Sequence, residues 1–404
     1  MTTYSNRKAS YLTVAFAVFM LAWGGNHFTP LLHLYEEIEN YQPWQANLLL
    51  GTYVGGLIPG LLLLAPLSDQ HGRKPVLLVG MGASIIASIM LAAGSQMFTV
   101  LCLGRVLAGF GVGAAMSVGS SWIKELSSAP FDRHADTSTG AKRSSLTLTL
   151  GFGLGAAATG LLAQWAPFPE VSPYLLHLVL SLMALLVLLR SPESLPVSAR
   201  STKTWYQDLA VPSASHHTFR RVIVPSAPWI FGAAGVAYAI LPASVDDRLG
   251  QWSTLYATIL TVLTLGTGAL VQNLVPWLNR HTGGRALRLG MALMTVGMVL
   301  SAIAAWADSP ALALAVAIML GAAYGICVVA GLIQVQAIAT AQDLAGLTGV
   351  YYALAYSGFL LPTILATLLP LLSYPSSLAL VALACALCAV VSGRAAGQSR
   401  TPGV

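Results

Sequence analysis

Long apolar runs alternate with short polar segments along the whole chain. Twelve of these runs approach 20 residues, the length that a helix needs to cross a hydrocarbon core of roughly 30 Å. Hydrophobic and polar positions do not alternate residue by residue within them, as they would in a membrane barrel. Each run therefore predicts a membrane-spanning helix, which satisfies its backbone amides within the segment. The predicted spans are 11–33, 45–66, 75–95, 100–122, 144–166, 173–190, 222–243, 253–277, 286–306, 310–335, 343–370 and 372–392.

The longest polar interruption, at 191–221, divides the spans into six and six. We expect a first six-helix bundle over 1–195, a linker over 196–221 and a second bundle over 222–404. Two bundles of this kind hold substrate near the membrane midplane between them. In the second half, the run at 343–370 is long enough to tilt or to include a turn at Pro362.

Composition supports the membrane assignment, since 56% of the 404 residues are hydrophobic and only 8% are charged. A soluble protein carries charge on roughly a quarter of its residues.

The first run follows Arg7 and Lys8, as a secretory signal would. It continues to about Leu32 with no small-residue cleavage site, so we predict that it is the first helix.

Basic residues predict the orientation, because Lys and Arg stay on the cytoplasmic side. With the amino terminus inside, eighteen of the twenty lie in cytoplasmic segments, Arg248 lies outside and Arg105 lies within a span. Both termini are therefore predicted to be cytoplasmic. The net charge of +6 then reflects topology and does not indicate nucleic-acid binding. The eighteen are Arg7, Lys8, Arg73, Lys74, Lys124, Arg133, Lys142, Arg143, Arg190, Arg200, Lys203, Arg220, Arg221, Arg280, Arg285, Arg288, Arg394 and Arg400.

A charged turn, Asp69-Gln70-His71-Gly72-Arg73-Lys74, joins the second and third spans. Gly72 permits the tight turn, and Asp69 can accept hydrogen bonds from helix amino-terminal amides or pair with a nearby Arg. The corresponding segment of the second half, 279–285, keeps Gly283 and Arg285 but has no Asp. Any ionic contact there would be weaker.

This turn resembles the signature loop of the major facilitator superfamily, which runs roughly Gly-x-Leu-Ser/Ala-Asp-Arg-x-Gly-Arg-Lys. The Asp-x-x-Gly-Arg-Lys kernel is intact, while Pro66 and Gln70 depart from the pattern. The resemblance covers essentially the whole chain and implies an all-α integral membrane fold, with twelve helices in two pseudo-twofold-related bundles. It also implies a latch that holds the halves closed on the cytoplasmic side, formed by Asp69, Gly72, Arg73 and Lys74. The alternative is that the two basic residues only anchor the loop.

Polar residues inside the predicted spans are candidates for the transport pathway. Arg105, in the fourth span, resembles an arginine that the superfamily carries there. A guanidinium inside a span is costly and therefore indicates a function. The alternative is that the side chain extends to the lipid headgroups by snorkelling. Asn26 and His27 follow a glycine pair in the first span and are expected to face a cavity. His27 lies at a depth similar to Arg105, so the two could act together on an anion or a proton. Alternatively, His27 is a hydrogen-bonded packing residue.

The fifth span contains Gly151 and Gly155. They partly match a glycine pattern of the superfamily's antiporters, in which Ala156 here replaces a proline. Small residues four apart otherwise indicate close helix packing. Other residues of the second half are also candidates for the cavity, because their side chains combine apolar surface with a hydrogen-bonding group. Each of them could instead be a packing residue. They are Trp229, Tyr238, Tyr324, Gln334, Tyr352 and Tyr356.

The leading hypothesis is a secondary transporter of a small molecule, similar to bacterial exporters and driven by proton exchange. His27 would titrate in place of a carboxylate, with Glu36 and Glu37 as possible relays at the outer mouth. An uncoupled facilitator, an uptake symporter and a membrane-embedded enzyme or receptor are the alternatives. No nucleotide-binding phosphate loop occurs, and we expect no cofactor, metal or nucleic-acid partner. The expected setting is the lipid bilayer of a bacterial inner membrane, with a monomeric protein and protons as the coupling ion.

Overall fold

The computed structural model describes residues 10–132, 135, 139–201, 211–340 and 343–398. Part of the predicted linker, 202–210, lies outside the described residues. So do five of the basic residues that carried the orientation argument, namely Arg7, Lys8, Arg133, Lys203 and Arg400.

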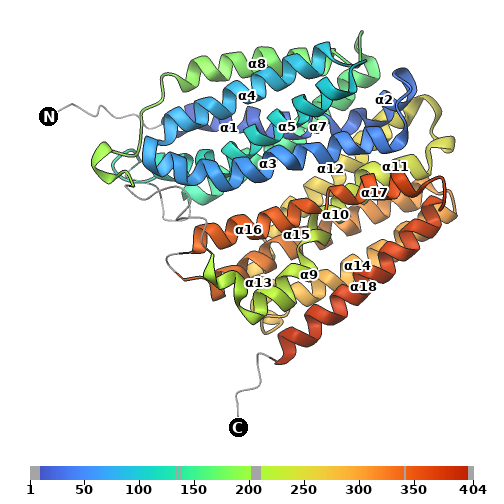
Figure 1. Ribbon diagram of the computed structural model, residues 1–404. Helices are drawn as coiled ribbons and strands as arrows, with labels where there is room; N and C mark the ends of the chain where they lie inside the picture. Colours follow the sequence, from blue (N-terminus) through green and yellow to red (C-terminus); the bar gives the residue numbers. More distant parts are fainter. Residues whose placement is uncertain (1–9, 133–134, 136–138, 202–210, 341–342, 399–404) are drawn as a thin grey trace. The chain divides into compact units, whose positions relative to one another are not determined.

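The described residues form helices at all twelve predicted positions. Eleven of these helices have the length and apolar composition needed to cross a membrane, and the twelfth, Ser172–Leu188, is an apolar helix of 17 residues. The fold is all-α and membrane-spanning, as the hydrophobic pattern predicted (Figure 1). The polar segments between runs became turns because they cannot satisfy their backbone groups in lipid.

The chain divides into two compact units. The first comprises Met1–Phe28 and Thr52–Asp208, and the second comprises Thr29–Gly51 and Leu209–Val404. The predicted first helix is therefore shared: α1 belongs to the first unit, whereas the 3₁₀ turn Thr29–Leu31 and the helix α2 group with the second. The helices of the first half of the chain are α1 (Ser10–Asn26), α2 (Leu32–Ile38), α3 (Pro43–His71), α4 (Arg73–Ala93), α5 (Phe98–Ala114), α6 (Ser120–Leu126), α7 (Thr139–Trp165) and α8 (Ser172–Leu188).

The second half of the chain contains the remaining helices. Three of its spans are interrupted or carry short flanking turns, so it has more named elements than spans. They are α9 (Val224–Ser226), α10 (Pro228–Gly235), α11 (Leu241–Ser244), α12 (Ser253–Gln272), α13 (Val275–His281), α14 (Ala286–Trp306), α15 (Pro310–Ile338), α16 (Leu344–Ser357), α17 (Leu360–Leu368) and α18 (Tyr374–Gln398).

The same helix pairings occur in both halves. The third span packs on the fourth and sixth (α4 on α5 and α8), and the ninth packs on the tenth and twelfth (α14 on α15 and α18). The first span packs on the fifth (α1 on α7), as the seventh packs on the eleventh (α10 on α16). This repetition is what two homologous six-helix repeats would produce.

In each unit, glycines allow the backbones of two helices to approach closely. A Cβ on Gly109 of α5 would lie 1.9 Å from the Tyr53 carbonyl oxygen of α3, and a Cβ on Gly325 of α15 would lie 2.5 Å from the Gly268 carbonyl oxygen of α12. Lipid gives little hydrophobic drive between helices, so they associate through close van der Waals packing at small residues.

Two helices depart from regular α geometry in the middle of a span. Ala115–Gly119 between α5 and α6, and Val236–Ile240 between α10 and α11, are π-helical. The eleventh span breaks at Gly358 and Phe359, and not at Pro362 as we expected. Pro362 lies in the first turn of α17, where its missing N–H costs no helical hydrogen bond.

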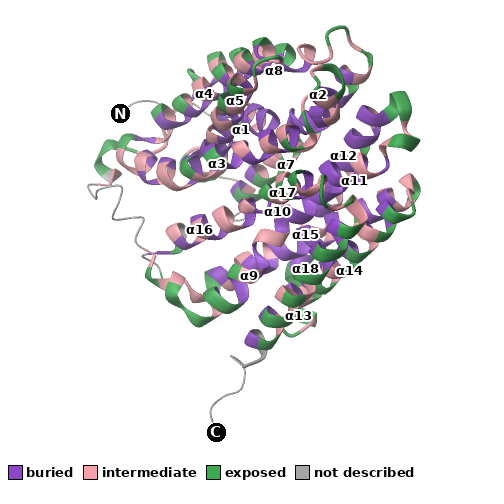
Figure 2. Cartoon of the chain, turned by 45° about the vertical axis from the view of Figure 1, so that its right-hand side comes forward, coloured by how far each residue is buried: buried purple, intermediate pink, exposed green. Residues whose placement is uncertain are grey.

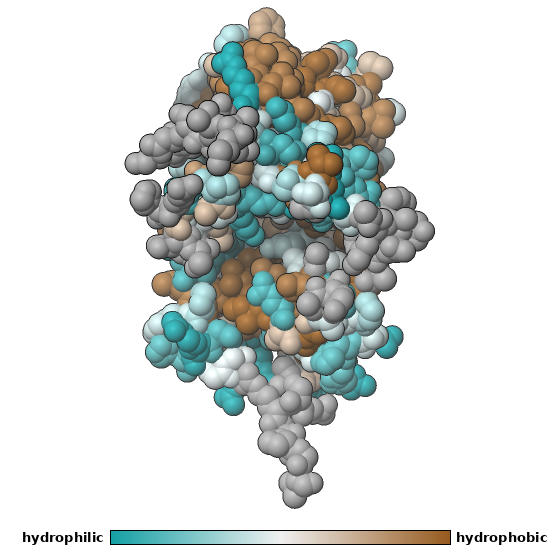
Figure 3. Space-filling view, turned by 90° about the vertical axis from the view of Figure 1, so that its left-hand side faces the viewer, coloured by the Kyte–Doolittle hydropathy of each residue, from teal (hydrophilic) through white to brown (hydrophobic). Residues whose placement is uncertain are grey.

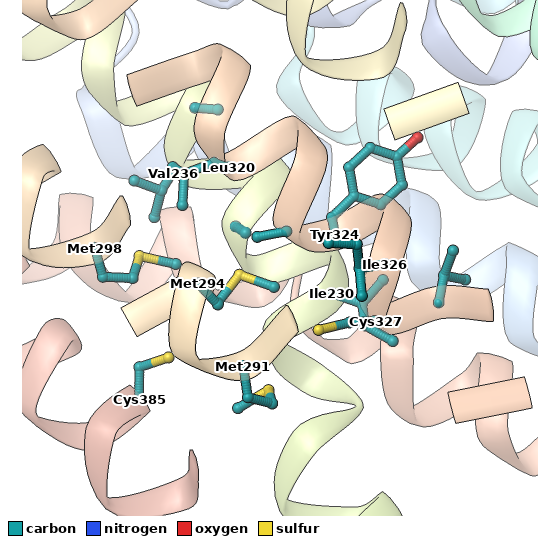
Figure 4. Packing of buried hydrophobic residues seen from close by; sticks show 14 of the residues in the cluster. Ile230, Val236, Met291, Met294, Met298, Leu320, Tyr324, Ile326, Cys327 and Cys385 are labelled. Atoms are coloured by element: carbon teal, nitrogen blue, oxygen red, sulfur yellow. The ribbon is translucent and has the colours of Figure 1, made fainter. Parts of the chain in front are cut away.

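Sulfur-containing and aliphatic side chains fill the interior of the second unit. Met294 and Met298 of α14 lie near Leu320 of α15 in Figure 4, with Met291 farther along α14. The outward surfaces of α14 and α18 remain exposed and apolar, with Leu383 and Leu387 each 59% exposed, as expected of lipid-facing residues (Figure 2). The face of the molecule seen in Figure 3 carries hydrophilic groups mixed with apolar patches.

Candidate functional site

The first predicted pathway residues lie where α1 ends. The helix continues through Gly24 and Gly25 and ends at Asn26. The glycines instead allow close packing, because a Cβ on Gly25 would lie 2.7 Å from Val112 Cγ2. Asn26 donates from Nδ2 to the Phe152 carbonyl oxygen at 3.2 Å.

His27 follows immediately and is completely buried. Neither of its ring nitrogens has a hydrogen-bond partner among the described residues. Its ring makes edge-to-face contacts with Tyr174 and His177 of α8, at centroid distances of 4.9 and 4.8 Å. A buried polar ring without partners is costly, and the described residues supply no hydrogen bond of the kind that the packing alternative for His27 assumed.

Arg105 of α5 is also completely buried. Its guanidinium carbon lies 4.6 Å from the Phe28 ring centroid and 4.8 Å from that of Tyr53. Its Nη1 atom lies 3.5 Å from the Gly25 carbonyl oxygen. Arg105 therefore approaches the chain on both sides of His27. The protein encloses its side chain completely, so the guanidinium does not lie on the outer surface.

Sequence reasoning missed His177, which lies beside His27. His177 Nε2 is 2.8 Å from the Met20 carbonyl oxygen, and Nδ1 is 2.7 Å from Ser88 Oγ. These bonds connect α8 to α1 and α4, which pack together (Figure 1). The signal that identified His27, a polar residue in an apolar run, was equally present at Ser88 and His177.

The signature turn is an ionic cluster within the first unit. Gly72 has φ +101°, which favours glycine. Arg73 pairs with Asp69 at 2.5 Å and with Glu125 of α6, whose Oε1 lies 2.9 Å from Nη2. Asp69 thus pairs with the arginine of its own motif. Glu125 was not predicted, because 52 residues separate it from Arg73.

A second unpredicted carboxylate caps the helix that begins at this turn. Glu193 accepts from the backbone amides of Arg73 at 3.1 Å and Lys74 at 3.0 Å, the first two residues of α4. A carboxylate at this position satisfies unpaired amides and complements the positive end of the helix dipole. Lys74 Nζ donates in turn to the Leu189 carbonyl oxygen at 2.7 Å. The segment after α8 is therefore joined to the signature turn.

The second unit has its own carboxylate at a chain junction. Asp343 accepts from the Ser213 amide at 2.8 Å, and from the amide and hydroxyl of Thr340, both at 2.8 Å. These hydrogen bonds, those from Ser213 foremost, hold the pKa of Asp343 well below its usual range. The residue lies between two spans and fastens the segment at Ser213 to the start of α16.

Three of the predicted aromatic residues meet in the second unit. Phe231 of α10 stacks on Tyr356 of α16, with centroids 4.0 Å apart, and lies 6.2 Å from Tyr324 of α15. Tyr238 reaches the same cluster through Phe359, at 6.2 Å. Tyr324 projects away from the methionine core in Figure 4. We call Phe231, Tyr238, Tyr324, Tyr356 and Phe359 the aromatic cluster.

The other predicted pathway residues of the second unit lie outside the aromatic cluster. Trp229 packs against the hydrophobic core, and Tyr352 contacts Tyr351 at 5.4 Å. Gln334 is partly buried, with its Oε1 atom lacking a partner among the described residues.

Gly151 and Gly155 lie where α7 crosses α1. A Cβ on Gly151 would lie 2.6 Å from the Phe19 carbonyl oxygen, and one on Gly155 would lie 2.8 Å from Trp23 Cα. Both positions require a small residue for helix packing.

His33, at the end of the first predicted span, contacts two acids of the second unit. His33 Nε2 lies 3.2 Å from Glu37 Oε1 and 3.2 Å from Asp246 Oδ1. Residues 29–51 belong to this unit, so these contacts are internal to it.

In the described part of the chain, no group of three or more His, Cys, Asp or Glu side chains is arranged to hold a metal ion.

Comparison with known proteins agrees with this architecture. A family model described as Major Facilitator Superfamily matches residues 14–362. The 4-hydroxybenzoate transporter PcaK of Pseudomonas aeruginosa is 30% identical over 315 residues, which are 72% of this chain and 64% of that protein. The tetracycline resistance protein, class B, of Escherichia coli is 29% identical over 168 residues, 41% of this chain and 34% of that protein. The chain thus spans less than two thirds of the length of these curated relatives.

Solved structures share the fold. The crystal structure of the nucleoside transporter NupG matches 98% of this chain and 100% of that chain, with a TM-score of 0.73 and 14% identity. At that identity the likeness concerns the fold alone. The family model, however, covers most of the sequence and includes the signature turn and the buried cluster around His27. The protein is therefore a member of the major facilitator superfamily.

Proposed function

We propose that the protein exchanges a small organic molecule for protons across a bacterial inner membrane, with both termini in the cytoplasm and export as the working direction. The observation that carries the proton coupling is the contact between the rings of His27 and His177, both completely buried, with centroids 4.8 Å apart. An imidazole is the side chain whose charge changes most readily near neutral pH. A titratable group inside a membrane span is a functional candidate by default.

The charge of the site favours an anionic substrate. None of the fourteen acidic residues lies within the first six predicted spans, whereas Arg105 lies in the fourth. Cation–π contacts such as those with Phe28 and Tyr53 contribute about 0.5–2 kcal/mol each. A carboxylate on the substrate would pair with the Arg105 guanidinium in a charge-assisted interaction.

The ionic cluster at the signature turn is proposed as the conformational latch. Asp69, Gly72, Arg73 and Lys74 would act together with Glu125 and Glu193. Their contacts keep the ends of α3, α4, α6 and α8 together. Alternating access requires such a bundle to move as one body, and losing the Asp69 charge should slow that movement.

A second candidate, uptake by proton symport, is favoured by a different observation. The longest curated match is to a 4-hydroxybenzoate transporter, whereas the match to the tetracycline resistance protein and the partial glycine pattern at Gly151 and Gly155 favour export. The sign of the coupling separates the two, since a symporter accumulates substrate on the alkaline side and an antiporter on the acidic side.

Purified protein in liposomes with an imposed pH gradient tests the proposal. Radiolabelled 4-hydroxybenzoate and tetracycline serve as the anionic and drug probes. We expect gradient-driven accumulation that Asp69→Asn slows and His27→Ala abolishes. Transport that is equally fast with and without the gradient would instead identify a facilitator. Accumulation that survives in His27→Ala would remove His27 from the coupling mechanism.

A further inference from the structure

We propose that His177 binds the coupling proton, and that its Nδ1 atom is the proton-binding site. The inference rests on the proposed proton coupling and names the group that carries the proton. The starting protonation state follows from the partners of His177. Its Nε2 lies 2.8 Å from the Met20 carbonyl oxygen. A carbonyl oxygen only accepts, so Nε2 carries a hydrogen and Nδ1 of the neutral ring is bare.

Ser88 is placed to serve both protonation states of that Nδ1 atom. Its hydroxyl oxygen lies 2.7 Å from Nδ1 and 3.1 Å from the Ser84 carbonyl oxygen. In the neutral state the hydroxyl donates to Nδ1. When a proton from water binds Nδ1, the new N–H donates to the hydroxyl oxygen, and the hydroxyl hydrogen turns to the Ser84 carbonyl. Each polar atom keeps a partner in both states, so the usual cost of leaving a buried group unsatisfied does not arise.

His27 lacks this arrangement, although the two rings touch. Their centroids are 4.8 Å apart and their planes meet at 79°. A proton on His27 would create an N–H without a partner among the described residues. It would also lie near Arg105, which contacts Gly25 and Phe28 on either side of His27.

The pair can hold one proton and not two. Two charged imidazoles in contact inside a low-dielectric interior repel each other strongly. Each element packed around the pair contributes its own polar group: Arg105 from α5, Ser84 and Ser88 from α4, and Tyr174 and Ser181 from α8. Hydrogen bonding favours His177 as the residue that binds the single proton. The positive charge then lies farther from Arg105 than it would on His27.

A purely structural role for His177 makes a different prediction. The ring connects three helices, and a Cβ on Gly24 of α1 would lie 3.0 Å from its Cε1 and Nε2 atoms. A residue that served only this packing would keep the neutral Nε2–H form at every pH. The protonation state of His177 therefore distinguishes the two roles without any substrate.

Nitrogen-15 NMR of histidine-labelled protein in lipid bilayers measures that state directly. The signals absent from His177→Gln assign the residue, and in the unmodified protein they should change from the Nε2–H form to the imidazolium as the pH is lowered to about 5. Ser88→Ala should move the midpoint to lower pH by about one unit, a tenfold change in proton affinity. Ser181→Ala, whose hydroxyl lies 3.3 Å from Nε2, is the matched control and should leave it in place. A His177 signal that stays neutral at pH 5 overturns the proposal.

Transport separates failure of this inference from failure of the proposed function. His177→Gln should lose gradient-driven accumulation of 4-hydroxybenzoate while keeping its exchange at equal pH on both sides. Loss of both activities, or of neither, would overturn the role of His177. If the unmodified protein ignores the pH gradient, proton coupling itself is wrong. If it responds to the gradient while His177 stays neutral, only the assignment of the proton to His177 is wrong.

Discussion

At the scale of single residues, Gly56 of α3 marks the closest approach of two helices in the first unit. A Cβ at this position would lie 1.7 Å from the Val106 carbonyl oxygen of α5, so the backbones must separate to admit it. Gly56→Ala should lower the free energy of unfolding by about 1–3 kcal/mol, measured by thermal unfolding in detergent. Gly55→Ala is the matched control, since nothing lies within 4 Å of its Cβ. Equal midpoints for the two variants would contradict this packing.

Arg105 carries a prediction about substrate charge. Arg105→Gln removes the positive charge, and we expect transport of 4-hydroxybenzoate to fall at least about tenfold, the effect of losing roughly 1.4 kcal/mol. Transport of its neutral methyl ester should change little. Arg105→Lys keeps a charge but loses the planar contact with Phe28 and Tyr53, so it should restore only part of the activity. Equal losses for the two probes in Arg105→Gln would remove the anion preference.

The candidate site was predictable where the residue type alone was informative. His27 and Arg105 stand out in apolar spans, and the structure buries both completely. Their neighbours were not predictable, because the contact of His177 with Met20 crosses 157 residues of sequence. Only the packing of α8 on α1 and α4 brings these groups together. The aromatic residues showed the same limit, since sequence could not separate Tyr356, in the aromatic cluster, from Tyr352 outside it.

At the scale of helices, Glu193 should contribute to stability through α4. Glu193→Gln removes the charge that faces the first amides of the helix, those of Arg73 and Lys74. Losses of capping and dipole interactions are typically about 0.5–2 kcal/mol. The variant should therefore unfold at lower temperature, whereas Asp247→Asn, an exposed acid, should not. An unchanged midpoint for Glu193→Gln would show that solvent caps the helix equally well.

Asp343 predicts a pH dependence of stability. Its pKa in the folded protein is held below the usual range by hydrogen bonds from Ser213 and Thr340. A group with a depressed folded pKa contributes stability above its unfolded pKa of about 3.9 and loses it as the pH falls. The gap in melting temperature between the unmodified protein and Asp343→Asn should be constant from pH 7 to about pH 5 and shrink below it. A gap that stays constant down to pH 3 would contradict this role.

The spans themselves were predictable because a bilayer imposes one length and one composition on every helix. The predicted run at 286–306 coincides with α14, and that at 100–122 lies inside the helix that continues to Leu126. Interruptions were harder to locate. The eleventh span breaks at Gly358, where a Cβ would lie 2.0 Å from the Pro228 carbonyl oxygen of α10. The break is set by a tertiary contact as well as by the nearby proline, and sequence shows only the proline.

At the scale of the whole molecule, the account describes two units that repeat one pattern of helix pairing while carrying different chemistry. The first unit holds the imidazole pair, Arg105 and the ionic cluster at Gly72. The second holds the aromatic cluster and an apolar core. Repeats that share a backbone plan but differ in buried groups suit a carrier, because each can take a different part in binding protons and substrate.

Proton movement coupled to substrate movement is the central claim, and it can be measured without an imposed gradient. Liposomes that contain the protein and a pH-sensitive dye are mixed with 4-hydroxybenzoate or tetracycline. We predict a change in internal pH that begins with substrate addition, requires the protein and disappears in His27→Ala. Substrate entry without any protein-dependent pH change would contradict the account.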